Sequence, residues 1–159
     1  MALVIRKSAI HSFGCYTTKR IRKGTLIVEY VGERLGREEA NELYEDSPNT
    51  YLFGLDGGRQ IIDGHGVAAF VNHSCKPNCE TDQIGGKMWV IARRDIEPGE
   101  ELTYDYNLYD GEEEIPCLCR AKRCRGSLYS TEHLRKLKKK CEKEAAAAAN
   151  LAAEVAKAS

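Results

Sequence analysis

Short apolar runs separated by glycine-containing turns fill most of the first 110 residues. The run at residues 25–31 is dense in β-branched side chains and is bounded by Gly24 and Gly32, so it predicts a strand between those glycines. Residues 8–16 predict a turn-bearing approach to this strand. Many short strands joined by tight turns indicate a mostly β domain with short helices.

Two hairpins are predicted from glycine pairs that lie between apolar runs. Residues 51–62 turn at Asp56-Gly57-Gly58, and residues 80–92 turn at Gly85-Gly86. Pro98-Gly99 predicts a further turn. The chain therefore reverses direction repeatedly before residue 100.

Two segments carry helical patterns. Residues 37–46 predict a short helix with a solvated acidic face, stopped by Ser47-Pro48. From Ser130 onward the chain is Lys-rich and then Ala-rich, so it predicts a long helix with Ser130 as N-cap and Glu132 in its first turn. An apolar stripe runs along this helix through Leu134, Leu137, Cys141, Ala148, Leu151 and Val155.

The stripe is thin and partly alanine, which decides what the long helix is expected to do. Docking on the rest of the chain or simple solvation is preferred, and a weak coiled-coil dimer is the alternative to a monomer. The basic run at residues 136–143 is compatible with weak nucleic-acid contact, although a charge run is usually a solvated face.

Composition suits one domain with an appendage. The 159 residues carry 24 Lys and Arg against 24 Asp and Glu, and 42% hydrophobic residues are enough for a core. No apolar run could span a membrane, and the apolar part of the N-terminus is too short for a secretion signal. We expect a soluble, intracellular protein.

Cysteine spacing indicates a metal rather than a disulfide framework. Seven cysteines are an odd number. Cys117-Leu118-Cys119 and Cys124 form a C-x-C-x4-C cluster among Arg and Lys residues, which favour the thiolate that binds metal. Three thiolates leave tetrahedral zinc one ligand short, and cysteines without a shared metal are the alternative.

Candidate chemistry is concentrated in two segments that set reactive polar groups in an apolar frame. The first reads Asn72-His73-Ser74-Cys75 followed by Pro77-Asn78-Cys79, and the second reads Glu101-Leu102-Thr103-Tyr104-Asp105-Tyr106. Such groups are costly to bury without partners, so the two segments are expected to form a site.

This pair of motifs resembles that of SET-domain lysine methyltransferases, from about Ile5 to Leu128. The resemblance implies a SET-domain β fold with a knot-like active-site core, a zinc-closed post-SET tail and a C-terminal α-helix. It places the SET domain at residues 1–113, the post-SET zinc-binding segment at 114–129 and the Lys/Ala-rich helix at 130–159. The implied cofactors are S-adenosyl-L-methionine and structural Zn²⁺.

The same resemblance assigns roles to individual residues. It supplies Cys75 as the fourth zinc ligand beside Cys117, Cys119 and Cys124, and leaves Cys15, Cys79 and Cys141 as ordinary thiols. Tyr106 matches the catalytic tyrosine, and Tyr104 and Tyr30 line the lysine channel. The implied donor contacts are Phe13, Gly14, Cys15, Phe70, Asn72, His73, Tyr106 and Leu128, with His73 acting partly through its backbone.

At two positions the chain departs from that family. Of the family's Gly-x-Gly turn only the second glycine is present, as Gly14, with Ser12 and Phe13 before it. Ala69 stands where relatives have a donor-contacting arginine. A surface turn with Gly14 at positive φ is the structural alternative.

Methyl transfer to lysine needs the neutral amine. Deprotonating an ordinary lysine at pH 7 costs about 4 to 5 kcal/mol, and an apolar channel beside a positive sulfonium lowers that cost. Tyrosine at position 104 takes up space that further methyl groups would need, so we predict mainly mono- or dimethylation. A histone or histone-like tail is the leading substrate, attracted by the acidic residues 110–114, which are otherwise a solvated loop.

Two other functions compete with this one. His73 and Cys75 could belong to a cysteine hydrolase, which is disfavoured because the sequence shows no third group to orient the histidine. A non-catalytic SET-fold module that binds peptide or protein is the other alternative. The expected location is the nucleus or chromatin in a eukaryote and the cytoplasm in a microbe.

Overall fold

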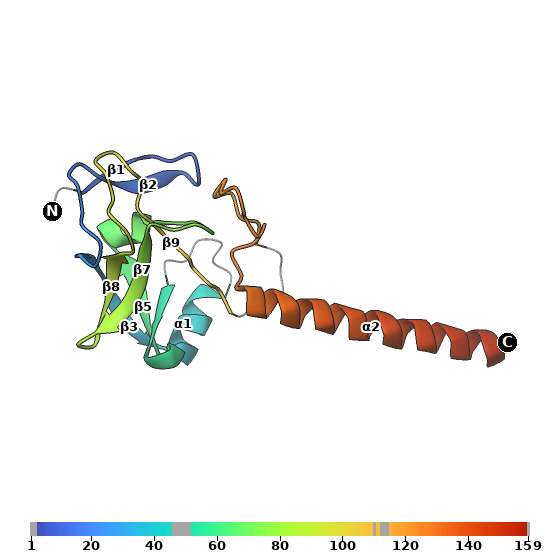
Figure 1. Cartoon of the computed structure of the whole chain (residues 1–159). Helices are drawn as coiled ribbons and strands as arrows, with labels where there is room; N and C mark the ends of the chain where they lie inside the picture. The colour runs from blue at the N-terminus through green and yellow to red at the C-terminus, as the bar shows by residue number, and fades with distance from the viewer. Residues whose placement is uncertain (1–2, 46–51, 110, 112–114, 159) are drawn as a thin grey trace. The chain divides into compact units, whose positions relative to one another are not determined.

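The computed structural model describes residues 3–45, 52–109, 111 and 115–158 (Figure 1). It contains two compact units, Met1–Asp105 with Leu118–Cys124, and Tyr106–Cys117 with Arg125–Ser159. The elements, in chain order, are β1 (Leu3–Lys7), β2 (Phe13–Thr17), β3 (Leu26–Gly36), α1 (Arg37–Tyr44), β4 (Leu52–Leu55), η1 (Asp56–Gly58), β5 (Gln60–His65), η2 (Val67–Phe70), β6 (Asn72–His73), β7 (Cys79–Ile84), β8 (Lys87–Ala92), β9 (Thr103–Tyr104) and α2 (Thr131–Ala158).

The main sheet of the first unit has the strand order β4-β5-β3-β8-β7. Every pairing in it is antiparallel, and the two predicted hairpins are confirmed as β4–β5 and β7–β8. The predicted turn at Pro98-Gly99 is also present, with Gly99 at φ +87°. Together with two smaller sheets this confirms the prediction of a mostly β fold.

The central strand β3 is longer than the pattern predicted. The prediction that it ends at Gly32 is wrong, because the strand continues to Gly36. Gly32 lies opposite Gly64 of β5, and a Cβ on Gly32 would lie 1.9 Å from the carbonyl oxygen of Asp63. The glycine allows two strands to approach closely and does not mark a turn.

An N-terminal hairpin, β1–β2, precedes this sheet and was not predicted. Gly14 lies inside β2 with ordinary strand geometry, so the alternative of a turn with Gly14 at positive φ is wrong. Ser12, one residue before the strand, has the positive φ instead, at +32°.

The two motif segments lie side by side as a parallel pair, β6–β9, which aligns Asn72 with Thr103 and His73 with Tyr104. The Ser74 amide extends the pairing by donating to the Tyr104 carbonyl at 3.0 Å. The Asn78 side chain also joins the segments, because it accepts from the Thr103 amide at 2.9 Å and donates to the Glu101 carbonyl. These bonds hold the site together.

The second unit joins residues 106–117 to the start of α2. Backbone bonds link Leu108 to Leu128 and Ser130. The Ser130 hydroxyl accepts from the His133 amide at 3.0 Å, which confirms the predicted N-cap. His133, Leu134 and Leu137 are partly buried, whereas residues 138–149 are exposed.

Several predictions fall on positions that the structure does not describe. They are Asp46 and the stop at Ser47-Pro48 after the 37–46 helix, the first residue of the 51–55 strand, and most of the acidic stretch 110–114. The side chains of Leu151 and Val155 are outside the description as well. Neither described helix is long and apolar enough to cross a bilayer.

Candidate active site and metal centre

Three aromatic side chains of the first unit come together beside the paired motif segments. Tyr30 on β3 is 4% exposed and Tyr104 on β9 is 8% exposed. The ring of Phe53 on β4 lies between them, with its centroid 5.1 Å from that of Tyr30 and 6.0 Å from that of Tyr104. The structure therefore brings together the two predicted channel tyrosines and adds Phe53, which the sequence analysis missed.

A glycine makes room for the first of these rings. A Cβ on Gly64 would lie 2.3 Å from the ring of Tyr30 and 2.5 Å from its hydroxyl. Only a residue without a side chain fits between β5 and this tyrosine. The buried side chains packed around Tyr30 are Leu55, Ile62, Ala68 and Met88, so the aromatic group has an apolar surround.

The expected donor contacts before β6 are joined by the amide of Asn72. Its Nδ2 donates to the carbonyl oxygen of Phe13 at 2.9 Å and to Oε1 of Glu101 at 2.7 Å. A Cβ on Gly14 would lie 2.1 Å from that carboxylate oxygen, so a side chain at position 14 would force the carboxylate of Glu101 to move. Phe13 is 51% exposed beside this group.

Cys15 and Phe70, also expected near the donor, differ in accessibility. Cys15 is fully buried, and burial, with a smaller effect of Glu101, raises the pKa of its thiol to about 12. The thiol is therefore protonated at neutral pH and unreactive, as expected for an ordinary cysteine. Phe70 ends η2 and is half-buried.

His73 is 3% exposed, and both of its ring nitrogens have protein partners. Nδ1 lies 3.5 Å from Oδ1 of Asp105, and Nε2 lies 3.3 Å from Sγ of Cys75. The sequence argument that no third group orients this histidine is therefore wrong, because Asp105 occupies that position. Because both ring nitrogens face protein groups, we expect any contact of His73 with the methyl donor to be made through its backbone.

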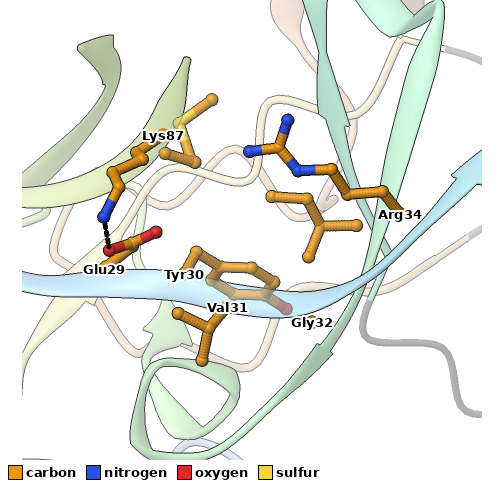
Figure 2. Close-up of a pocket in the computed structure, with 8 residues that line it drawn as sticks. Glu29, Tyr30, Val31, Gly32, Arg34 and Lys87 are labelled. Carbon is orange, nitrogen blue, oxygen red and sulfur yellow. Dashed lines mark hydrogen bonds and ion pairs between the residues drawn. The ribbon is translucent and has the colours of Figure 1, made fainter. Parts of the chain in front are cut away.

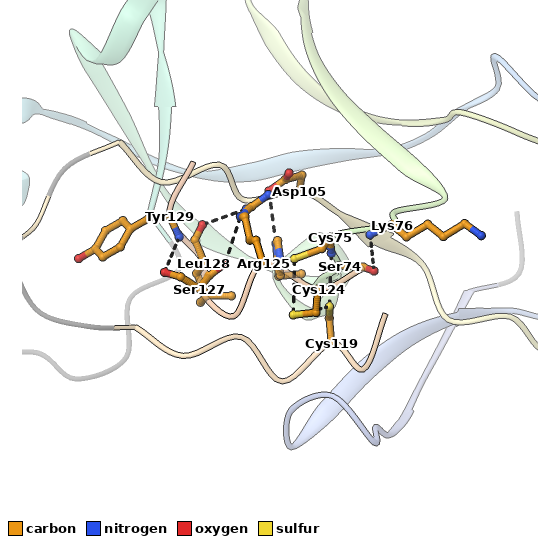
Figure 3. A network of polar contacts seen from close by, with 11 residues as sticks. Ser74, Cys75, Lys76, Asp105, Cys119, Cys124, Arg125, Ser127, Leu128 and Tyr129 are labelled. Carbon is orange, nitrogen blue, oxygen red and sulfur yellow. Dashed lines mark hydrogen bonds and ion pairs between the residues drawn. The ribbon is translucent and has the colours of Figure 1, made fainter. Parts of the chain in front are cut away.

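The thiols of Cys75, Cys119 and Cys124 converge in the first unit (Figure 3). The Sγ of Cys124 lies 3.8 Å from that of Cys75 and 3.7 Å from that of Cys119. Tetrahedral zinc with Zn–S bonds of about 2.3 Å separates its sulfur ligands by about 3.8 Å. The two measured sulfur separations therefore fit a zinc site. None of the seven cysteines is in a disulfide bond, so these thiols are available to a metal.

Two further observations complete this thiol cluster. The Cys75 amide donates to Sγ of Cys119 at 3.4 Å, which stabilises negative charge on that sulfur. His73, Cys75 and Cys119 offer ligand atoms within 4.8 Å of one another. His73 is thus a potential metal ligand that the cysteine pattern did not reveal. Cys117, two residues before Cys119, belongs to the second unit.

Tyr106 and Leu128 also belong to the second unit, and both are half-buried. Leu128 is held by its own neighbours, since its carbonyl accepts from the amide of Leu108 and from Nη2 of Arg125. The roles predicted for Tyr106 and Leu128 stay predictions.

A small pocket of about 100 Å³ lies along β3 and shares Tyr30 with the aromatic group (Figure 2). Tyr30 and Met88 line it, together with Arg34 and the ion pair of Lys87 with Glu29, whose Nζ and Oε2 are 2.9 Å apart. Cofactor-sized ligands need roughly 300 Å³ or more, so this pocket is too small to hold the donor.

The fold and the site define a β domain in which two motif segments pair in parallel between an aromatic group and a thiol cluster suited to zinc. Comparison with known proteins gives the family. The family model described as SET domain matches residues 12–107, which is more than half of the chain. The chain belongs to the SET-domain family.

Its curated relatives are much longer proteins. It is 42% identical over 137 residues to "Histone-lysine N-methyltransferase, H3 lysine-4 specific" of Aspergillus oryzae, which covers 77% of this chain and 11% of the relative. The protein of the same name from Saccharomyces cerevisiae is 39% identical over 141 residues, covering 79% and 13%. "Histone-lysine N-methyltransferase ash1" of Drosophila melanogaster is 42% identical over 132 residues, covering 75% and 6%. The chain thus spans roughly a tenth of the length of these relatives.

Proposed function

We propose that this chain is an S-adenosyl-L-methionine-dependent protein-lysine N-methyltransferase that mono- or dimethylates a lysine in a histone or histone-like tail. The main support is the β6–β9 pair, which aligns His73 with Tyr104 and carries Tyr104 into contact with Phe53. The names of the relatives agree with this reaction and with a histone substrate.

The aromatic group supplies what the lysine side chain needs. Tyr30 and Phe53 are held in an apolar surround, and the ring of Phe53 contacts that of Tyr104. Such a surround disfavours the ammonium form and so favours the neutral amine. The same rings fix the direction in which the amine points, and orientation is a large part of catalysis by proximity. We assign the hydroxyl of Tyr106 to a position beside the reacting centre.

The donor supplies the methyl group when it is bound. We assign its contacts to the Phe13, Gly14 and Cys15 backbone, to Phe70, Asn72 and His73, and to Tyr106 and Leu128. The half-exposed ring of Phe13 offers apolar surface, while the amide of Asn72 is already engaged with protein oxygens. Asn72 therefore shapes the donor site mainly by holding Phe13.

Zinc would be held by Cys75, Cys117, Cys119 and Cys124, with the three thiols of the first unit already at suitable spacing. It would be structural, because four thiolates leave no open coordination position. Bound zinc would link the segment that contains Cys117, Cys119 and Cys124 to Cys75, which follows β6.

A cysteine hydrolase is the second candidate that a specific observation favours, since Asp105, His73 and Cys75 form a connected group. The thiol spacing opposes it, because Cys75 lies at ligand distance from Cys124 and beside Cys119. A zinc-bound thiolate would not serve as a free nucleophile. The non-catalytic binding module is the remaining alternative.

The first test is mass spectrometry of core histones incubated with the protein, zinc and S-adenosyl-L-methionine. We expect gains of one or two methyl groups on lysine, with activity lost in Tyr106→Phe and in Cys119→Ser. Donor binding without transfer to histones would point to a non-histone substrate. A protein that does not bind the donor would contradict the proposal in favour of the binding module.

Nuclear or chromatin location in a eukaryote, or cytoplasmic location in a microbe, follows from this proposal. Contact with nucleic acid through residues 136–143 and dimerisation through α2 stay predictions.

A further inference from the structure

Glu101 is the point at which three separate parts of the first unit meet. Its carboxylate accepts from the Ser8 hydroxyl at 2.8 and 3.0 Å, from the Tyr16 hydroxyl at 2.9 Å and from Nδ2 of Asn72 at 2.7 Å. These donors come from the turn after β1, from β2 and from β6. Hydrogen bonds to a charged acceptor are about twice as strong as neutral ones, so the carboxylate is a strong link between these parts.

Two of those partners continue into the segment that leads to β2. Ser8 accepts from the Ile10 amide at 2.9 Å through its hydroxyl, and its own amide donates to the Ser12 carbonyl at 3.1 Å. Asn72, held at Oε1 of Glu101, donates to the carbonyl of Phe13. Both ends of the turn formed by residues 8–13 are therefore fixed through one side chain.

Gly14 completes the arrangement by leaving space for the carboxylate. A Cβ there would lie 2.1 Å from Oε1 of Glu101. The backbone of β2 also pairs with this segment, through the bridge of Tyr16 with Glu101 and the bond from the Leu102 amide to the Cys15 carbonyl at 2.7 Å. The side chain of Glu101 thus lies against β2, the strand to which the first donor contacts are assigned.

We propose that Glu101 is a positioning residue for donor binding, which sets the turn of residues 8–13 against Asn72 without touching the donor. This inference rests on the proposed function, because it assigns the donor to that turn. The need for such a link is explained by Ser12, whose φ of +32° is a conformation that side chains rarely adopt. A turn without its family glycine depends on contacts that hold it in place.

The test compares Glu101→Ala, Glu101→Gln and Glu100→Ala in titrations of the full chain with S-adenosylhomocysteine. Glu100 is the matched control, because its carboxylate pairs with Arg94 on the neighbouring turn and makes none of the three contacts. We expect Glu101→Ala to weaken binding about tenfold and Glu101→Gln about threefold, the Gln oxygen retaining one acceptor. Glu100→Ala should bind as the wild type does.

A second measurement separates positioning from a general loss of stability. Amide exchange in the free protein should accelerate at Ile10 in both Glu101 variants and stay unchanged in the control, and the KM for the donor should rise more than kcat falls. Should Glu101→Ala fail to fold, the Gln variant decides. Wild-type affinity in a folded Glu101→Gln protein overturns the inference alone, whereas a wild-type protein that does not bind S-adenosylhomocysteine overturns the proposed function as well.

Discussion

At the scale of single residues, the site depends on positions whose neighbours are remote in the sequence. The need of their polar groups for partners pointed to the two motif segments as a site, and the family resemblance made Asn72, His73, Cys75 and Tyr104 predictable within them. Phe53 was not predictable in the same way. It contacts Tyr30 and Tyr104 across strands, and such contacts depend on how the sheet pairs rather than on any local pattern.

Replacing Tyr104 by phenylalanine tests whether this residue limits the number of methyl groups that the proposed enzyme transfers. Loss of the hydroxyl leaves more room at a position that is 8% exposed, so Tyr104→Phe should shift the product toward trimethyl-lysine. The check is the distribution of methyl counts by mass spectrometry on one peptide. An unchanged distribution at equal turnover would show that Tyr104 does not limit the product.

Ser12 is one residue at which a substitution should stabilise the chain. A left-handed backbone costs a non-glycine residue about 1 kcal/mol, so Ser12→Gly should raise the free energy of unfolding by about 0.5 to 1 kcal/mol. Urea denaturation measures it. Ser12→Ala is the control, since it removes the hydroxyl and keeps the backbone cost. A gain in the alanine variant as well would assign the effect to the hydroxyl.

At the scale of elements, glycine pairs between apolar runs predicted both hairpins of the main sheet, and the N-cap predicted the start of α2. The β1–β2 hairpin was missed because its connection, residues 8–12, has no glycine pair or proline to signal a reversal. The end of β3 was predicted too early because a glycine required by strand packing has the same appearance in sequence as one in a turn.

Strand β3 offers a matched pair of glycines that tests this account. Gly32→Ala would place a Cβ 1.9 Å from the Asp63 carbonyl, whereas a Cβ on Gly36, in the same strand, has nothing within 4 Å. We expect Gly32→Ala to lower the free energy of unfolding by about 2 kcal/mol or more and Gly36→Ala to have little effect. Equal losses in urea denaturation would contradict this assignment.

The cap of α2 gives a second prediction at this scale. Ser130→Ala removes the acceptor of the His133 amide and should cost about 1 kcal/mol, seen as faster amide exchange over residues 134–140. Thr131→Ala, one residue later and exposed, is the control and should leave exchange unchanged.

At the scale of the whole molecule, the proposed zinc site would link stability to metal. We expect elemental analysis to find one zinc per chain. Cys119→Ser should lose this zinc. Cys141→Ser is the control and should retain it, because Cys141 is exposed on α2, away from the proposed ligands in sequence. Chelation should lower the melting temperature of the wild type. Since protons compete with zinc for thiolates, release should increase as the pH falls. A melting temperature insensitive to chelator would contradict a structural metal.

The parallel pair β6–β9 has a consequence for how the chain folds. Its two-residue strands are far apart in sequence, and the β7–β8 hairpin between them pairs locally. Closing a long loop is slow because its entropy is lost before the contact is gained, whereas a hairpin closes early. The β6–β9 pair is therefore expected to form after the β7–β8 hairpin that it encloses. A chain that has formed only its local hairpins would have β content but no site.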